Sequence, residues 1–236
     1  MTVKDIMAVL QANGSESVKK ILVKHGVKEP FFGVKIADLK PIQKKVKKDY
    51  QLAKDLFATG NADAMYLAGL IADDEQMTRA DLQLWVRQAV STNIGEYTVP
   101  WVAAGGRYGF DLGLEWIDSP VEHIAASGWA TLNNVVALKP DSELDLDKLL
   151  TLLIRVGQQI PPSAGRVAYM MNAFVIGVAC YVRPLADEAM AIAVSIGAVT
   201  VNMNGTACKV PLATDHIKKV WDKRGGVAPK KTNVKC

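Results

Sequence analysis

The stretch WIDSPVEHIAASGWATLNNVV, residues 116–136, decides the fold class. It starts at the end of one helix, crosses a polar turn that contains a proline, and enters an alanine-rich apolar helix. Ser119, Pro120 and Glu122 form a helix-start pattern: a serine cap, proline in the first turn and glutamate at the third helical position. We therefore expect a turn followed by a helix that begins near Pro120.

Two further stretches repeat this layout, FATGNADAMYLAGLIAD (57–73) and IPPSAGRVAYMMNAFVIGVACYV (160–182). Their spacing is irregular, which favours a loose stack of helix pairs over a strict repeat array. Small side chains in these stretches allow helix axes to approach to about 8–10 Å. The small residues are Ala64, Ala68, Ala125, Ala126, Ala168 and Ala173.

The rest of the chain also has a helical pattern. Thr78 with Asp81 three residues later is a helix start, and Asn61 after Gly60 marks another boundary. Apolar residues then recur at intervals of three and four, as expected for one face of a helix. The exception is AVTVNM (198–203), a short stretch that is compatible with extended structure. The sequence thus predicts an all-α fold of stacked antiparallel helix pairs.

Charge is distributed unevenly along the chain. Residues 1–60 hold twelve Lys and Arg against six Asp and Glu, residues 61–208 hold eight against sixteen, and residues 209–236 hold eight against two. We expect residues 1–208 to form one domain and residues 209–236 a basic helix with a mobile tail. The basic ends suggest a polyanionic partner, and solubility explains them equally well.

No motif predicts a metal site or a cofactor. The three cysteines, Cys180, Cys208 and Cys236, are far apart, and the three histidines are equally scattered. The first ten residues are too polar for a secretory signal. The longest uncharged stretch, between Arg166 and Arg183, is shorter than the roughly 18 residues that a membrane span needs. We therefore expect reduced thiols and a cytoplasmic location.

The N-terminal part resembles the AlkD-like DNA alkylation repair family. The resemblance lies in GVKEPFFGVKIADLKPIQKKV (26–46) and LAKDLFATGNADAMYLAGLIADDEQMT (52–78). Its hallmark is Phe32-Gly33-Val34-Lys35 ahead of Leu39-Lys40, followed by a leucine- and alanine-rich helix that ends at an aspartate, Asp73. The match covers roughly the first 90 residues, and the later segments resemble the family mainly in helical layout.

The resemblance implies a curved superhelix of HEAT-like repeats whose concave basic surface holds duplex DNA. For catalytic members it also implies excision of positively charged N3- or N7-alkylated purines. Such members use an aspartate beside the sugar, flanking tryptophans and phosphate-binding arginines. A cationic base leaves readily, so a carboxylate that stabilises the sugar and aromatic faces that contact the base suffice for the chemistry.

The candidate site departs from that pattern. No aspartate lies between Asp81 and Asp111, and Glu96 is the acid in the corresponding region, STNIGEYTVPWVAAGGRYGF (91–110). Glu96 is therefore the candidate catalytic carboxylate, with a glutamate near a helix start as the alternative interpretation. The candidate nucleic-acid contacts are Lys35, Lys40, Lys44, Lys45, Lys47, Lys48, Tyr97, Trp101, Arg107, Trp129, Lys218 and Lys219.

Two functions follow from these observations. The first is a DNA-binding repair protein that excises alkylated purines through Glu96 and the neighbouring aromatic residues. The second is a non-catalytic helical-repeat scaffold that binds nucleic acid or protein through its basic termini. The acidic central segment weighs against tight DNA binding there, because phosphate neutralisation requires Lys and Arg.

Overall fold

The computed structural model describes residues 1–160, 165–203 and 205–235. Within these ranges every regular element is a helix. The turn expected around residues 161–163 lies outside the described residues, and residues 198–203 form a loop. The helices are α1 (Val3–Asn13), α2 (Glu16–Lys24), α3 (Ile36–Val46), α4 (Tyr50–Phe57), α5 (Ala62–Ile71), α6 (Arg79–Gln88), η1 (Ile94–Thr98), α7 (Val99–Gly105), α8 (Gly109–Trp116), α9 (Glu122–Leu138), η2 (Asp141–Glu143), α10 (Leu146–Gln159), α11 (Arg166–Tyr181), η3 (Arg183–Leu185), α12 (Ala186–Ile196) and α13 (Ala213–Arg224).

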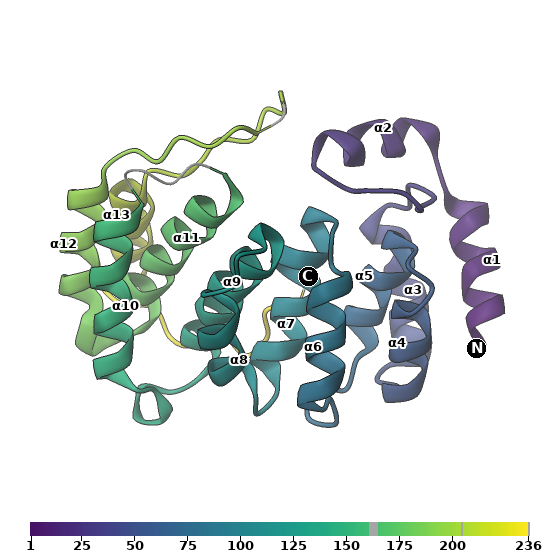
Figure 1. Ribbon diagram of the computed structural model, residues 1–236, viewed down its shortest axis with the longest axis horizontal. Coiled ribbons are helices and arrows are strands. Elements are labelled where there is room, and N and C mark those ends of the chain that lie inside the picture. The colour runs from purple at the N-terminus through teal and green to yellow at the C-terminus, as the bar shows by residue number, and fades with distance from the viewer. Residues whose placement is uncertain (161–164, 204, 236) are drawn as a thin grey trace.

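The helices stack in two rows, which confirms the predicted all-α fold of helix pairs. An inner row of α5, α7, α9 and α11 runs through the molecule, each helix packed against the next (Figure 1). The outer helices α4, α6, α8, α10 and α12 pack against this row or against each other. All ten residues of α5 are buried, because the helix has neighbours on every side. Since the inner helices share one direction along the stack, their N-terminal ends lie together and so do their C-terminal ends.

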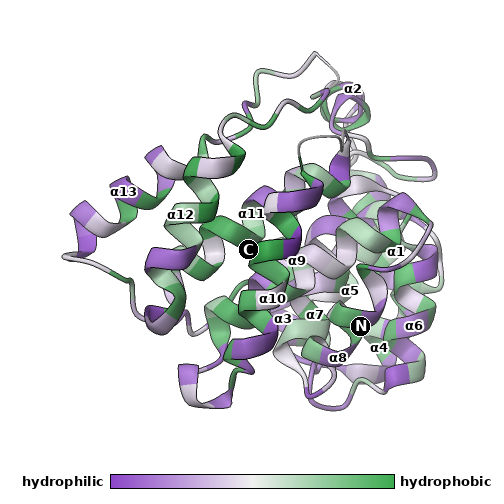
Figure 2. Ribbon diagram, turned by 60° about the vertical axis from the view of Figure 1, so that its left-hand side comes forward, coloured by the Kyte–Doolittle hydropathy of each residue, from purple (hydrophilic) through white to green (hydrophobic). Residues whose placement is uncertain are grey.

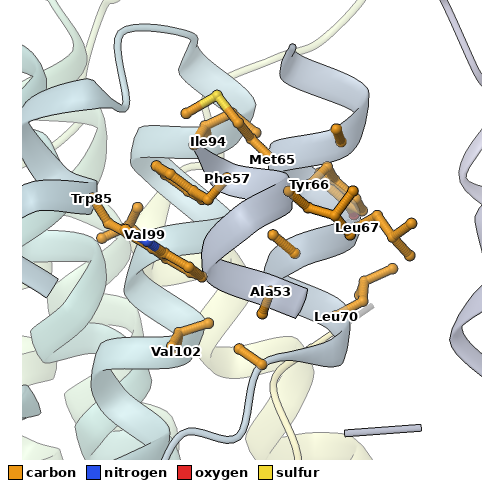
Figure 3. Close-up of a cluster of buried hydrophobic side chains, with 14 of the residues drawn as sticks. Ala53, Phe57, Met65, Tyr66, Leu67, Leu70, Trp85, Ile94, Val99 and Val102 are labelled. Carbon is orange, nitrogen blue, oxygen red and sulfur yellow. The ribbon is translucent and has the colours of Figure 1, made fainter. Parts of the chain in front are cut away.

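Aromatic stacking holds the N-terminal half of the stack. The rings of Phe57 and Trp85 lie parallel, with centroids 4.0 Å apart, between α4 and α6 (Figure 3). Val99 and Ile94 pack beside them, so α7 and η1 are fixed to the outer row at the same point. Burial of side chains of this size contributes about 1.5–3 kcal/mol each to stability. The position of η1 therefore depends on its packing against this aromatic cluster.

Glycines allow α9 to approach both the inner helix α11 and the end of the outer helix α8 closely. A Cβ atom added to Gly177 of α11 would lie 2.0 Å from Oδ1 of Asn133 on α9. One added to Gly128 of α9 would lie 2.6 Å from the backbone nitrogen of Ile117. Figure 2 shows the hydrophobic residues gathered on these central helices, whereas the outlying α13 carries many hydrophilic ones. Among the described residues no single helix meets the length and hydropathy of a membrane span, and α11 with the helices after it does so only as a pair bent by 116°.

Helix starts were predicted with mixed success. Thr78 and Asp81 form the predicted capping box, and the Asn61 side chain caps α5. The helix starts near Pro120 as predicted, at Glu122, but the predicted serine cap was wrong because Val121 is the N-cap residue and Glu122 the first helical residue. The Ser119 hydroxyl accepts the backbone N–H of Val121 at 3.2 Å and stabilises a turn before the helix. Ser119 therefore stabilises the loop before α9 and does not cap the helix.

The C-terminal residues pack back along the stack, and the division into a domain and a mobile tail stays a prediction. Residues 228–235, the C-terminal strap, run from the end of α11 to the end of α5. The backbone N–H groups of Ala228 and Lys231 donate to the carbonyls of Cys180 and Ala137. Lys235 Nζ donates to the carbonyl of Ala72 at 3.1 Å. The strap thus supplies donors to carbonyls that have no partner within their own helices.

Candidate nucleic-acid interface

The Phe-Gly-Val hallmark fixes the N-terminal helices to α5. The Asp63 carboxylate, in the first turn of α5, accepts the backbone N–H groups of Phe32, Gly33 and Val34 at 2.6, 3.0 and 3.2 Å. Burial raises the pKa of Asp63, and the three N–H donors oppose that rise by stabilising the ionised form. Gly33 has a φ of +81°, which side chains disfavour. The hallmark is therefore a structural clamp.

Two backbone contacts then join the end of α2 to the segment before η1. The backbone N–H of Lys28 donates to the Ser91 hydroxyl at 2.9 Å, and that of Thr92 donates to the Gly26 carbonyl at 3.2 Å. Lys24 and Lys28 are exposed on either side of this junction. The clamp and the junction together place basic side chains over the N-terminal ends of the inner helices.

Two cavities lie over these ends, and together we call them the N-terminal groove. The first, the aromatic cavity, has a volume of about 330 Å³. The second, the polar cavity, has a volume of about 470 Å³. The aromatic cavity is lined by Lys24, His25, Ile36, Tyr66, Thr92, Asn93, Tyr97, Trp101, Arg166, Tyr169, Met203, Thr206 and Cys208. The polar cavity is lined by Gly26, Lys28, residues 89–92, Gly95, Glu96, residues 121–123, Ala126 and Arg166.

Arg166 lies between the two cavities and is bound to Glu96. Its Nε donates to Glu96 Oε1 at 2.5 Å, and its Nη2 donates to Oε2, so the ion pair is bidentate. The backbone N–H of Arg166 donates to Glu122 Oε1 at 2.9 Å. The guanidinium also lies 4.3 Å from the ring centroid of Tyr169. Arg166 therefore neutralises one carboxylate and occupies an oxygen of a second.

Burial dominates the electrostatics of this pair. Glu96 is 5% exposed, and burial raises the pKa of its carboxyl group, which the hydrogen bonds and positive charge of Arg166 partly offset. Burial also raises the pKa of Tyr97 to about 12, so its hydroxyl stays protonated at neutral pH. Glu96 lies in the π-helical turn η1, a rare conformation that is frequent at functional sites.

The structure brings together only some of the predicted site residues. Glu96, Tyr97 and Trp101 all lie at the N-terminal groove, because η1 continues into α7 and Pro100 occupies its first turn without breaking the run. Trp129, predicted as a nucleic-acid contact, is fully buried and packs against Phe174 with ring centroids 5.3 Å apart. It has no surface that DNA reaches in this conformation.

Most of the predicted lysines lie elsewhere. Lys40, Lys44, Lys47 and Lys48 line a separate cavity of about 820 Å³ that the C-terminal strap borders. Exposed side chains also include Lys35 and Lys45 at either end of α3, Arg107 after α7, and Lys218 and Lys219 on α13. Lys35 precedes Ile36, a residue of the aromatic cavity. These residues remain predicted contacts, spread over more than one face.

Sequence reasoning missed Arg166, Tyr169, Asn93 and Lys24. One signal for Arg166 is in the sequence: it is the single charge at the start of the long uncharged stretch that forms α11. A cation at a helix N-terminus is unfavourable for the helix dipole, so it calls for another partner. The pairing with Glu96, seventy residues away, has no local signature.

Stacked helix pairs along one curved inner row define the class of HEAT-like repeat proteins. A model of the DNA alkylation repair enzyme family matches residues 6–102. An uncharacterized protein of Listeria monocytogenes is 30% identical over 216 residues, covering 89% of this chain and 93% of its own length. A counterpart in Listeria innocua is 29% identical over the same coverage.

A solved structure matches the whole chain, with a TM-score of 0.90, 33% identity and complete coverage of both chains. It represents a new family of proteins related to the HEAT-like repeat DNA glycosylases with affinity for branched DNA structures. The present chain belongs to this HEAT-like DNA alkylation repair family, which confirms the resemblance seen in its first 90 residues.

Proposed function

We propose that this chain binds branched DNA across the N-terminal groove and does not excise bases. The observation that carries the proposal is the bidentate ion pair between Glu96 and Arg166. Excision requires a carboxylate that faces the sugar with a free oxygen. Both oxygens of Glu96 are bonded to the guanidinium, and the residue is 5% exposed.

The other carboxylate of the groove is also engaged. Among the described residues that line the two cavities, Glu96 and Glu122 are the only acids. Glu122 Oε1 accepts the backbone N–H of Arg166 at 2.9 Å. Rupture of a buried charge pair costs about 3–5 kcal/mol, which would be added to the barrier of any reaction that recruits Glu96.

The groove is suited to DNA phosphates in two respects. Lys24 and Lys28 contribute positive charge, and α9 and α11 begin at the groove with the positive ends of their dipoles. The matched solved structure comes from a family with affinity for branched DNA, and its similarity covers the whole chain, including the groove. A branch point offers phosphates from several arms, which a curved surface contacts at once.

The test is a pair of measurements on the same protein. Fluorescence anisotropy compares a four-way junction with a linear duplex of the same arm sequence, over a salt series. We expect tighter binding to the junction and an affinity that falls as salt rises. In parallel, release of N7-methylguanine and N3-methyladenine from duplex DNA is measured beside an active glycosylase.

We expect no base release from the wild-type protein. Release above background that Glu96→Gln abolishes would contradict the proposal and establish excision through Glu96. Equal affinity for junction and duplex would contradict the proposed preference for branched DNA.

A further inference from the structure

The aromatic cavity has the shape and lining of a small-molecule site. Its volume of about 330 Å³ lies at the lower end of the range for such sites, about 300–1,000 Å³. Four aromatic side chains line it, one each from α5, η1, α7 and α11. Trp101 packs edge-on to Tyr66, with ring centroids 5.4 Å apart, and lies 6.1 Å from Tyr97. Tyr169 lies on the opposite element, α11, beneath the guanidinium of Arg166.

Two residues of the cavity lining each carry a buried polar atom without a partner among the described residues. Oδ1 of Asn93 and Oγ1 of Thr206 are buried and accept or donate no hydrogen bond among the described residues. Both residues line the cavity, one from the segment before η1 and one from the loop after α12. Buried polar atoms are almost always paired in folded proteins, so unpaired ones in a cavity point to a ligand that completes them. The oxygens call for N–H donors.

The rim of the cavity carries the positive charge of Lys24. Lys24 and His25, at the end of α2, form one side of its lining, and their burial is low. Tyr97 is 41% exposed, so part of its side chain is accessible from outside although its hydroxyl group is buried. A ligand with a flat aromatic body, N–H donors on one edge and an attached anion matches the walls, the oxygens and the rim together.

We propose that the aromatic cavity receives one unpaired nucleobase from a DNA branch point. This proposal rests on the proposed function, binding of branched DNA. The base stacks on Tyr97, and its exocyclic amine donates to Asn93 Oδ1, which is buried in the free protein and reaches the base when the Asn93 side chain turns towards the cavity. The flanking phosphate lies at Lys24 and His25. Bases at a branch point are already partly unstacked, so their extrusion costs less than from a continuous duplex.

The experiment compares two four-way junctions that differ only in one unpaired adenine at the branch point. Binding to the wild-type protein is measured by anisotropy, and insertion by the fluorescence of 2-aminopurine at the unpaired position. We expect the junction with the unpaired base to bind about tenfold more tightly, the effect of one stacked base. We also expect quenching of 2-aminopurine when the protein binds.

Variants of Tyr97 and Asn93 assign the effect to the cavity. Tyr97→Ala should abolish the preference for the unpaired base, measured as the ratio of the affinities for the two junctions, whereas it lowers the affinity for both junctions to the extent that Tyr97 contacts DNA in the groove. Tyr97→Phe, the matched control, should keep the preference because it retains the ring. An unpaired thymine lacks an exocyclic amine and should bind more weakly than adenine, a difference that Asn93→Ala should remove.

The outcomes separate the two proposals. Tight binding to both junctions without preference, or a preference unaffected by Tyr97→Ala, overturns base insertion and leaves the proposed function standing. Binding to neither junction overturns the proposed function, and base insertion with it. Equal affinity for unpaired adenine and thymine overturns the role assigned to Asn93.

Discussion

The two ends of the inner helices differ in how their backbone groups and charges are satisfied. At the C-terminal ends, the C-terminal strap donates to carbonyls of α5, α9 and α11, and Lys230 Nζ donates to the Val136 carbonyl at 2.9 Å. Lysines at helix C-termini also interact favourably with the negative end of the helix dipole. These ends are therefore closed by the chain itself.

The N-terminal end of α5 is capped by Asn61, but those of η1, α9 and α11 border the two cavities. The buried atoms Asn93 Oδ1, His123 Nε2 and Thr206 Oγ1, in residues that line these cavities, have no hydrogen-bond partner among the described residues. The same helices are therefore stabilised by hydrogen bonds at their C-terminal ends, whereas polar atoms without hydrogen-bond partners among the described residues lie near their N-terminal ends. Regions with few stabilising contacts, such as these helix ends, are typical of binding surfaces.

Removal of the strap should have the largest effect on stability. Truncation after Gly226 deletes the donors to α5, α9 and α11 and leaves Asp74 buried without Lys235. We expect the free energy of unfolding to fall by at least about 4 kcal/mol, as judged from a single unpaired buried charge and the lost hydrogen bonds. Urea denaturation checks this. A loss below about 1 kcal/mol would show that the helix ends do not depend on the strap.

The ion pair between Lys235 and Asp74 should account for most of that loss. Their side chains are 10% and 15% exposed, and burial lowers the pKa of Lys235 and raises that of Asp74. Lys235→Met should destabilise the protein by about 3 kcal/mol because it strands the carboxylate. The double variant with Asp74→Asn should recover more than half of this loss. Additive losses in a double-mutant cycle would exclude coupling between the two groups.

Charge removal at the N-terminal groove should affect binding, with little effect on stability. Lys24→Ala with Lys28→Ala should weaken junction binding by about tenfold and reduce the salt slope by roughly 2, one for each phosphate contact. Lys44→Ala with Lys47→Ala, on the strap side, is the matched control with the same charge change. We expect it to change affinity less than about threefold. Equal losses in both pairs would mean that DNA covers both ends.

A small pH dependence of the stability should come from Asp81 in the outer helix α6, away from both ends of the inner helices. Burial acts to raise the pKa of Asp81, but hydrogen bonds from Lys54, Thr78 and Tyr50 outweigh it and hold the pKa at about 2. Because the folded pKa lies below the unfolded value near 3.9, the stability it contributes is present above pH 4 and is lost as pH falls towards 2. After allowance for solvent screening this amounts to about 1 kcal/mol.

Unfolding measured between pH 5 and pH 2 with wild type and Asp81→Asn isolates this contribution. The variant should lack that part of the pH dependence, and parallel curves would contradict the assignment.

Local sequence signals predicted the fold well. Asn61 and the Thr78–Asp81 box cap helices as expected, because a capping residue and its partners are neighbours in the chain. The Phe-Gly-Val hallmark identified the family, although its role as an Asp63 clamp needed the structure. The family resemblance also predicted HEAT-like helix pairs, which the whole-chain structural match confirms.

Long-range pairing was beyond the sequence. Nothing near Glu96 indicates Arg166, and nothing in the lysine-rich tail indicates that its donors reach carbonyls of helices formed much earlier in the chain. The sequence does not mark the carbonyl groups that lack a partner at helix ends, because every residue has a backbone carbonyl. Trp129 was ambiguous for a similar reason, because the same spacing serves a packed side chain and an exposed one.

The most direct test of where DNA binds is hydrogen–deuterium exchange with and without a four-way junction. We predict protection of residues 24–28, 91–97 and 121–125 and of the first turn of α11, with no change in residues 228–235. Protection confined to the strap and α3, or spread evenly over the molecule, would contradict binding at the N-terminal ends of the inner helices.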